Sequence, residues 1–175
     1  MNPILILYRS KYGATKRYAE LLKEEIDCNV FDVKDFRKSD LKNYDRIIFA
    51  GAIYASGISG LNFLRQNYKD LRDKKTAVFC VGASPLDETA LSGIKEHNLK
   101  GELKNIPLFY GRGAWDEESM TFKDRTLCKM LQKMVSKQDP ESCEPWMKAL
   151  LSAAGQKCDW TDRKYLIPLI EYITA

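Results

Sequence analysis

The stretch LYRSKYGATKRYAELL, residues 7–22, begins as an apolar strand, passes through a small polar loop and resumes as a helix. The loop, SKYGAT, lies between the predicted strand and the amino end of the predicted helix, where unpaired N–H groups and the helix dipole favour an anion. Ser10 and Thr15 add hydroxyl groups, and Gly13 lets the backbone turn closely around a ligand. The pattern predicts a phosphate-binding loop; the alternative is that Ser10 and Thr15 merely cap the helix.

Short runs rich in β-branched and aromatic residues recur along the chain, with helical patterns between them. This alternation is typical of a parallel sheet with crossover helices, so the predicted class is α/β. The first, third and fourth runs are apolar nearly throughout, which predicts burial on both faces of the sheet. The predicted strands are residues 3–8, 29–33, 46–51, 76–82 and 106–111.

Apolar residues spaced by three or four predict the helices between these strands. One helix follows the first strand, a second carries Leu61 and Leu71 on one face, and a shorter one surrounds Leu91. After the fifth strand the pattern no longer repeats, and residues 119–137 and 144–155 are predicted to form an extra helical segment. A last helix within residues 159–174 either kinks at Pro168 or restarts there.

Composition limits the class of protein. The chain has 175 residues, of which 45% are hydrophobic, so we expect a single domain over residues 1–175. Its five cysteines are scattered and form no C-x-x-C pair, which favours reduced thiols in a cytoplasmic protein and predicts no metal site. The net charge of +4 is spread among interspersed acids and bases, which argues against nucleic acid as a partner. No apolar run approaches the roughly 20 residues that cross a bilayer, so any membrane contact is expected to be peripheral.

Other phosphate sites and enzyme classes lack their motifs. The chain has no G-x-x-x-x-G-K-[ST] sequence, and the only G-x-G, at residues 111–113, lacks the third glycine of a dinucleotide fingerprint. The first strand ends in Tyr8, Arg9 and Ser10 rather than in the clustered acids of a phospho-receiver domain. The only histidine is His97, which is placed too late for a cobalamin module, and no G-x-S-x-G serves a serine hydrolase.

Residues 6–22 carry a longer pattern, Ile6-Leu7-Tyr8-x-Ser10-x-x-Gly13-x-Thr15-x-x-x-Ala19-x-x-Leu22. This pattern resembles the flavodoxin signature position for position. The resemblance implies a flavodoxin-like three-layer sandwich, with five parallel strands in the order 2-1-3-4-5 and FMN at the switch point between the first and third strands. Lys11 then either pairs with the FMN phosphate or points to water. The implied contacts in this loop are Ser10, Lys11, Tyr12, Gly13, Ala14 and Thr15.

The switch-point rule predicts that the loops after the first, third and fourth strands converge. The second of these, residues 51–60, is rich in glycine and small residues and offers Tyr54 as a contact for the flavin ring. The alternative is that Tyr54 is a partly exposed loop tyrosine. The third loop offers backbone donors to the pyrimidine edge, as in the proteins that it resembles. The predicted contacts in these two loops are Ala52, Ile53, Tyr54, Ala55, Ser56, Gly57, Gly82, Ala83 and Ser84.

Most of the chain also resembles one enzyme group within this class. Residues 44–67, the run GRGAWD at 111–116, the basic helix and the DW pair at 159–160 look like the flavodoxin-type protoporphyrinogen dehydrogenases, which use FMN and pass electrons to menaquinone. The resemblance implies an FMN-dependent oxidoreductase of the protoporphyrinogen or quinone type, with no catalytic residue assigned. The alternatives are a one-electron carrier, which a net charge of +4 disfavours, and a flavodoxin-shaped binding module without flavin.

Two features after the fifth strand are candidates for contact with a substrate or partner. Arg112 and Trp115 lie at the open end of the sheet, although Arg112 is equally well explained as a surface cation. The helix at residues 119–137 is basic and amphipathic. It either meets an anionic membrane, attracts a carboxylate-bearing substrate such as a porphyrinogen, or packs its apolar face on the core under a solvated lysine row. That apolar face comprises Leu127, Met130, Leu131 and Met134, opposite Arg125, Lys129, Lys133 and Lys137.

Overall fold

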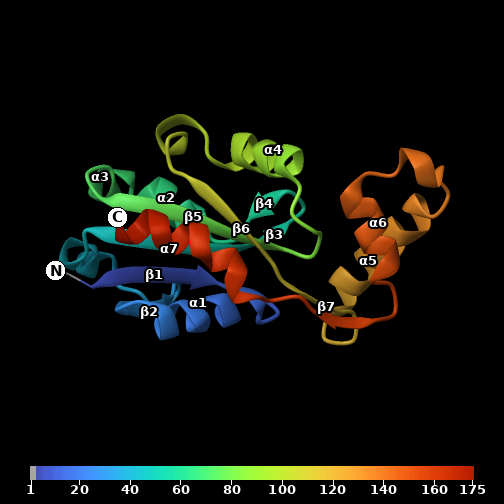
Figure 1. Ribbon diagram of the computed structural model, residues 1–175, viewed down its shortest axis with the longest axis horizontal. Coiled ribbons are helices and arrows are strands. Elements are labelled where there is room, and N and C mark those ends of the chain that lie inside the picture. Colours follow the sequence, from blue (N-terminus) through green and yellow to red (C-terminus); the bar gives the residue numbers. More distant parts are fainter. Residues whose placement is uncertain (1–2) are drawn as a thin grey trace.

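Apolar strands build the centre of the molecule. In β1 (Ile4–Arg9), successive side chains alternate between the two faces of the sheet, so that Ile4 and Ile6 join one core while Leu5 and Leu7 join the other. The computed structural model describes residues 3–175. Figure 1 shows its main sheet, in which β2 (Cys28–Asp32), β1, β3 (Arg46–Tyr54), β5 (Lys75–Gly82) and β6 (Leu108–Arg112) lie side by side and parallel. The predicted strand order, 2-1-3-4-5, is confirmed, and the short β4 (Gly57–Ile58) adds antiparallel to β3.

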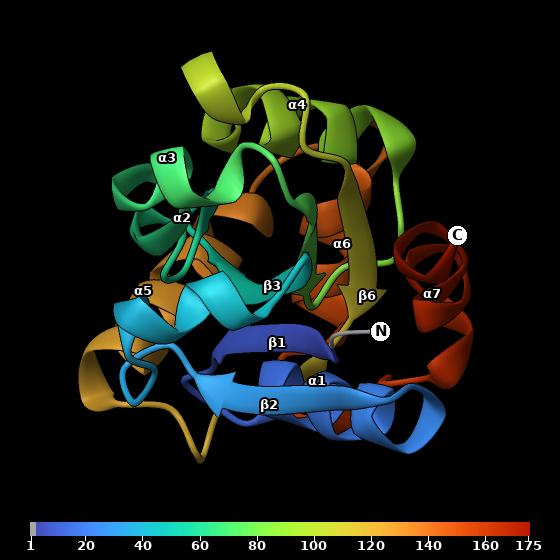
Figure 2. The same cartoon turned by 90° about the vertical axis from the view of Figure 1, so that its left-hand side faces the viewer.

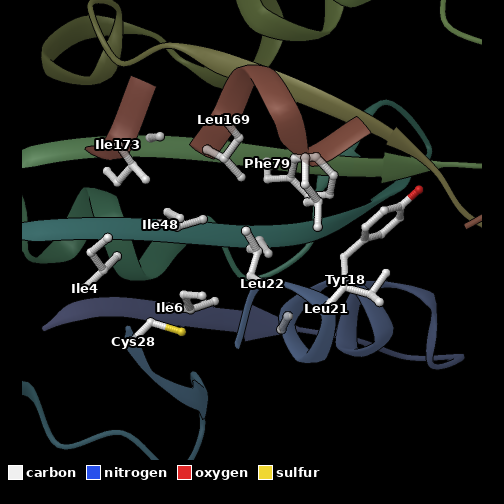
Figure 3. Packing of buried hydrophobic residues seen from close by; sticks show 14 of the residues in the cluster. Ile4, Ile6, Tyr18, Leu21, Leu22, Cys28, Ile48, Phe79, Leu169 and Ile173 are labelled. Atoms are coloured by element: carbon white, nitrogen blue, oxygen red, sulfur yellow. The ribbon is translucent and has the colours of Figure 1, made fainter. Parts of the chain in front are cut away.

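Helices cover both faces of the sheet (Figure 2). One face carries α1 (Ala14–Glu25), η4 (Arg163–Leu166) and α7 (Ile167–Thr174), over a core that includes Ile48, Phe79 and Leu169 (Figure 3). The other face carries η1 (Lys38–Asn43), α2 (Asn62–Gln66), α3 (Tyr68–Leu71), α4 (Glu88–Asn98) and η2 (Gly101–Leu103). Residues 4–7, 47–51 and 76–81 are all buried, which confirms the predicted burial of three strands on both faces.

Some elements differ in detail from those predicted. The helix expected through Leu61 and Leu71 is two short helices, because the backbone leaves the helical region at Asn67 (φ −113°, ψ 15°). The helix around Leu91 is longer than expected: α4 runs without a break through Gly93, and the Asp87 carboxylate caps it by accepting from the Ala90 N–H at 2.7 Å. The last helix restarts rather than kinks, because Pro168 stands in the first turn of α7, where a missing N–H costs no hydrogen bond.

An insert separates the last strand of the sheet from α7. Figure 1 shows its helices beyond the carboxyl ends of the sheet strands. Within it, β7 (Ala114–Asp116) pairs antiparallel with β8 (Lys157–Asp159), and α5 (Phe122–Val135), η3 (Pro140–Ser142) and α6 (Pro145–Ser152) lie between these strands in the chain. The two helices expected after the fifth strand are thus confirmed. The β7–β8 pair was not predicted, because strands of three residues carry too little periodicity to recognise.

The apolar face predicted for residues 119–137 does not pack on the core. Met130 and Met134 are 58% and 61% exposed, and Leu127 is 40% exposed. The buried side of α5 instead carries Asp124 and Val135. The interpretation of a core-packed face under a solvated lysine row is therefore wrong. Among residues 3–175, no helix combines the length and the apolar character that crossing a membrane requires.

Candidate functional site

The predicted cofactor loops come together because their parent strands are neighbours. In the sheet, Arg9 of β1 aligns with Gly51 of β3, and Ala52 of β3 aligns with Val81 of β5. The loops after these parallel strands therefore leave the same edge, where the strand order reverses. The first loop is residues 10–15. The second is the end of β3 with the turn into β4, residues 52–57, and the third is residues 82–84, where β5 ends.

The first loop presents a buried hydroxyl with no partner. Gly13 adopts φ +97° immediately before α1, and its N–H donates to the Ser10 Oγ at 3.0 Å. Gly13 occupies the N-cap position of α1 and makes no side-chain capping hydrogen bond there. Thr15 is 1% exposed, and its Oγ1 finds no hydrogen-bond partner in the part of the chain that the structure describes. Because buried polar atoms are nearly always paired, this hydroxyl fits an anionic ligand held at the start of α1.

The second loop has a tight turn of unusual composition. Ala55 and Ser56 have φ values of +47° and +65°, and they join the paired residues Tyr54 and Gly57. Positive φ at both central positions is typical of a type I′ hairpin, which favours Asn-Gly because most side chains are strained there, by roughly 1 kcal/mol each. Strained backbone of this kind persists where the surrounding structure holds it and is common at binding sites.

Asn98, at the end of α4, holds this turn in place. Its side-chain amide donates to the Ser56 carbonyl at 2.7 Å, and its amide oxygen accepts from the Ile58 N–H at 2.9 Å. Asn98 is 3% exposed, and Ile58 is also buried. Asn98 is a site residue that sequence reasoning missed, since nothing local connects it to a turn so far away in the chain.

We expect Asn98→Ala to lower the free energy of unfolding by about 2 kcal/mol, because it leaves a buried N–H and a carbonyl without partners. Urea denaturation measures the change. Asn62→Ala is the matched control, because the Asn62 side chain accepts its hydrogen bond from Arg65 at the surface. Removing that bond should change the free energy of unfolding by no more than about 0.5 kcal/mol. Equal stabilities for the two variants would contradict the role given to Asn98.

The third loop is fixed from the β6 side. The Gly82 carbonyl accepts from the Gly113 N–H at 2.7 Å, and the Ala83 carbonyl accepts from the Arg112 Nε at 2.9 Å. The Ser84 carbonyl accepts from the Tyr110 hydroxyl at 2.5 Å. Burial raises the pKa of Tyr110, which keeps this phenol protonated as a donor. Because all three carbonyls accept hydrogen bonds, the backbone of this loop is held in one conformation.

The two predicted substrate contacts lie in different surroundings. The Arg112 guanidinium lies at the third loop and stacks on the Trp160 ring, 3.8 Å from its centroid. Trp115 lies in β7 at the base of the insert, where its indole N–H donates to the Glu117 carboxylate at 3.3 Å. The structure therefore brings Arg112 to the cofactor loops and keeps Trp115 within the insert.

Asp124 of α5 meets the first and second loops. Its carboxylate pairs with the Lys11 ammonium and accepts from the hydroxyls of Tyr12 and Tyr54, the latter at 2.6 Å. Lys11 therefore has a partner in the insert, an arrangement that neither of its predicted alternatives includes. We call these four residues the Asp124 cluster. The sequence does mark the start of α5, because Thr121 precedes Asp124 by three residues and its hydroxyl caps the helix. That local pattern does not predict that Asp124 contacts Lys11, Tyr12 and Tyr54.

A cavity of about 330 Å³ lies within the insert, away from these loops. Several of its charged groups have partners within the insert. Asp116 pairs with Lys157 at 3.0 Å, and the Glu117 carboxylate accepts from Gln132 at 2.7 Å and from the Gly155 N–H at 3.4 Å. The cavity holds none of the predicted cofactor contacts; its lining is Asp116, Glu117, Glu118, Arg125, Lys129, Gly155, Gln156 and Lys157.

Comparison with known sequences agrees with this geometry. Residues 5–142 match the flavodoxin domain family. The chain belongs to the flavodoxin domain family. The match covers the parallel sheet apart from Ile4 and includes all of α5, so the fold is that of a flavodoxin-like protein.

Individual relatives of this flavodoxin-family chain are distant. A protoporphyrinogen IX dehydrogenase [quinone] of Leishmania major is 24% identical over 143 residues, an alignment that covers 74% of this chain and 62% of that protein. Among solved structures, a WrbA-like flavodoxin from Agrobacterium tumefaciens is 20% identical with a TM-score of 0.43, covering 71% of this chain and 88% of the other. A flavodoxin from the domain Archaea is 16% identical with a TM-score of 0.40, covering 73% and 91%.

Proposed function

We propose that this chain binds FMN and acts as an oxidoreductase on a protoporphyrinogen or a quinone. The observation that carries the cofactor is the buried, unpartnered hydroxyl of Thr15 at the start of α1, in a loop that carries the flavodoxin pattern. The substrate class has separate support in the distant similarity to the dehydrogenase of Leishmania major. Since the alignment spans 62% of that protein, the activity of the whole relative is a hypothesis for this chain.

In this proposal each loop has its own task. Ser10, Gly13 and Thr15 hold the phosphate with hydroxyl and N–H groups at the positive end of the α1 dipole. Tyr54 lies along the flavin ring, and its neighbours in residues 52–57 approach the ring with backbone atoms. Residues 82–84 offer N–H groups to the pyrimidine edge, since their carbonyls already accept from β6 and Gly113. FMN, when bound, supplies the electron-transfer chemistry, while the protein orients it and limits its access to water.

The test begins with the purified protein. Its visible spectrum is recorded with and without added FMN, and the loaded protein is then mixed anaerobically with protoporphyrinogen IX or with menaquinol. Flavin bleaching by either compound, followed by turnover with an acceptor, is the expected result. Flavin uptake without reduction by either compound would favour a one-electron carrier that serves a protein redox partner. A colourless protein that takes up no FMN would favour a binding module.

We also propose that this protein meets an anionic membrane surface through α5. Phe122 is 85% exposed, and Met130 and Met134 of the same helix are 58% and 61% exposed. Lys123 and Lys133 of the same helix are exposed as well. Apolar side chains interleaved with lysines are typical of helices that lie in the interface of a bilayer with anionic lipids. A quinone dissolves in the same bilayer, which makes this surface consistent with the proposed substrate class.

Sedimentation with vesicles tests this contact. The protein is expected to bind vesicles that contain phosphatidylglycerol and not vesicles of phosphatidylcholine alone. Replacing Lys123, Lys133 and Lys137 with Gln should weaken binding by roughly 100-fold, since each basic residue near such a surface contributes about 1 kcal/mol. Leu86→Ser is the control, because Leu86 is 51% exposed but lies outside the insert. Equal binding to both vesicle types would contradict the contact, and a dimer lost in Phe122→Ser would indicate that a second copy covers the face.

A further inference from the structure

The Asp124 carboxylate is buried where the insert meets the first two cofactor loops. Asp124 is 3% exposed, whereas Lys11, Tyr12 and Tyr54 keep substantial exposed area. The cluster therefore encloses the carboxylate and leaves the donor side chains near solvent. Lys11 Nζ also lies 5.3 Å from the ring centroids of both Tyr12 and Tyr54, so the cation, the two rings and the anion form one contiguous group.

The charges of this group favour one protonation state. The hydrogen bond from Lys11 is the main cause that holds the pKa of the Asp124 carboxyl far below its usual value, and the hydroxyls of Tyr12 and Tyr54 act in the same direction. The same contact raises the pKa of Lys11, and the hydrogen bond to Asp124 raises the pKa of Tyr54. At neutral pH the cluster thus holds a carboxylate at Asp124, an ammonium at Lys11 and a protonated phenol at Tyr54.

A role confined to α5 does not account for these contacts. An acid in the first turn stabilises a helix through the dipole without needing any partner. The amino-terminal start of α5 is already capped by Thr121, whose hydroxyl accepts from the Asp124 N–H at 3.3 Å. The Thr121 N–H in turn donates to the Tyr12 hydroxyl at 3.3 Å, which adds a second link from the helix start to the first loop. Both links cross from the insert to the loops that the FMN proposal assigns to the cofactor.

We infer that Asp124 is a positioning residue of the flavin site, which fixes Tyr12 and Tyr54 and fastens the insert beside the cofactor. The inference rests on the proposed FMN function. With Lys11 paired to Asp124, the phosphate is held by uncharged donors, including Thr15, and Lys11 serves to keep α5 in place. Because the insert and the flavin stabilise the same arrangement of the two loops, docking of the insert and binding of flavin favour each other.

The test compares FMN with riboflavin, which lacks the phosphate. Dissociation constants are measured by flavin fluorescence for the wild type, Asp124→Asn and Asp139→Asn. Asp139 is the matched control, because it is an exposed acid of the same insert whose carboxylate accepts from the Glu141 N–H within η3. Asp124→Asn is expected to weaken both ligands by a similar factor, roughly tenfold, since the hydrogen bonds to a charged acceptor are lost. The visible spectrum of the bound flavin should shift as well, because Tyr54 is no longer held.

Two other outcomes would overturn the inference. Tighter binding of FMN with unchanged riboflavin binding would mean that the carboxylate competes with the phosphate for Lys11. Unchanged binding of both ligands, with only a lower melting temperature, would mean that Asp124 serves the fold alone. Asp124→Ala provides a second variant for the same comparison.

A flavin-free measurement separates this inference from the proposed function. Hydrogen exchange of the protein without flavin should be faster in Asp124→Asn over residues 10–15, 52–57 and 117–125 and unchanged in Asp139→Asn. If the wild type binds neither flavin, the proposed function fails, and hydrogen exchange still decides whether Asp124 fastens the insert to the loops. Exchange that is the same in all three proteins would overturn that fastening role.

Discussion

Thr15→Val is expected to make the flavin-free protein more stable while weakening its affinity for FMN by roughly 10- to 100-fold. The side chain is 1% exposed, and its hydroxyl has no partner within residues 3–175. Valine keeps nearly the same shape without the hydroxyl, so the cost of burying an unpaired polar group, about 1–2 kcal/mol, disappears. The hydrogen bond to the phosphate disappears too, and a bond to a charged group contributes about 1.5–3 kcal/mol.

Two measurements decide this prediction. Thermal unfolding without flavin should show a higher melting temperature for Thr15→Val than for the wild type, and a fluorescence titration should show the loss of FMN affinity. Riboflavin affinity should not change, because riboflavin carries no phosphate, and Thr15→Ser should behave as the wild type in both assays. A less stable Thr15→Val protein with full FMN affinity would show that the hydroxyl faces no phosphate.

The fold was predictable because its signals are local and repeat along the chain. Apolar runs such as residues 46–51 and 76–82 are strands buried on both faces, and such strands need little context to be recognised. The first loop was predictable for a similar reason, since Ser10, Gly13 and Thr15 stand in a fixed register between a strand and a helix. The loops of β3 and β5 then followed from the switch-point rule, which needs only the strand order.

The contacts that join these loops to other elements could not be predicted. Asp124 and Asn98 act on turns far away in the sequence, and only the folded chain brings the partners together. The exposure of the apolar face of α5 could not be predicted either, because periodicity shows which residues share a face and not what that face meets. Pro168 is the opposite case, in which a local rule left two outcomes and the structure shows that the helix restarts.

Gly111→Ala is expected to lower the free energy of unfolding by about 3 kcal/mol, the largest loss of stability among these variants. A Cβ at Gly111 of β6 would lie 2.5 Å from Phe79 Cζ and 2.9 Å from Tyr18 Cζ, and both rings are fully buried. Tyr18 has little freedom to move, because its hydroxyl donates to the Arg112 carbonyl at 2.6 Å and accepts from the Asp162 N–H at 3.2 Å. Burial raises the pKa of Tyr18 to about 12, so the hydroxyl remains a donor at neutral pH.

Urea denaturation measures this loss, with Gly93→Ala as the control. A Cβ at Gly93 would have no atom within 4 Å, and Gly93 lies within α4, so alanine there should stabilise the chain by about 0.5–1 kcal/mol. If Gly111→Ala matched the wild type, the two rings would have to repack freely. The same variant should also bind FMN less tightly, because Tyr18 lies one turn after Thr15 in α1 and any displacement of its ring shifts the start of that helix. A destabilised protein with unchanged FMN affinity would show that the phosphate loop is held independently of the Tyr18 contact.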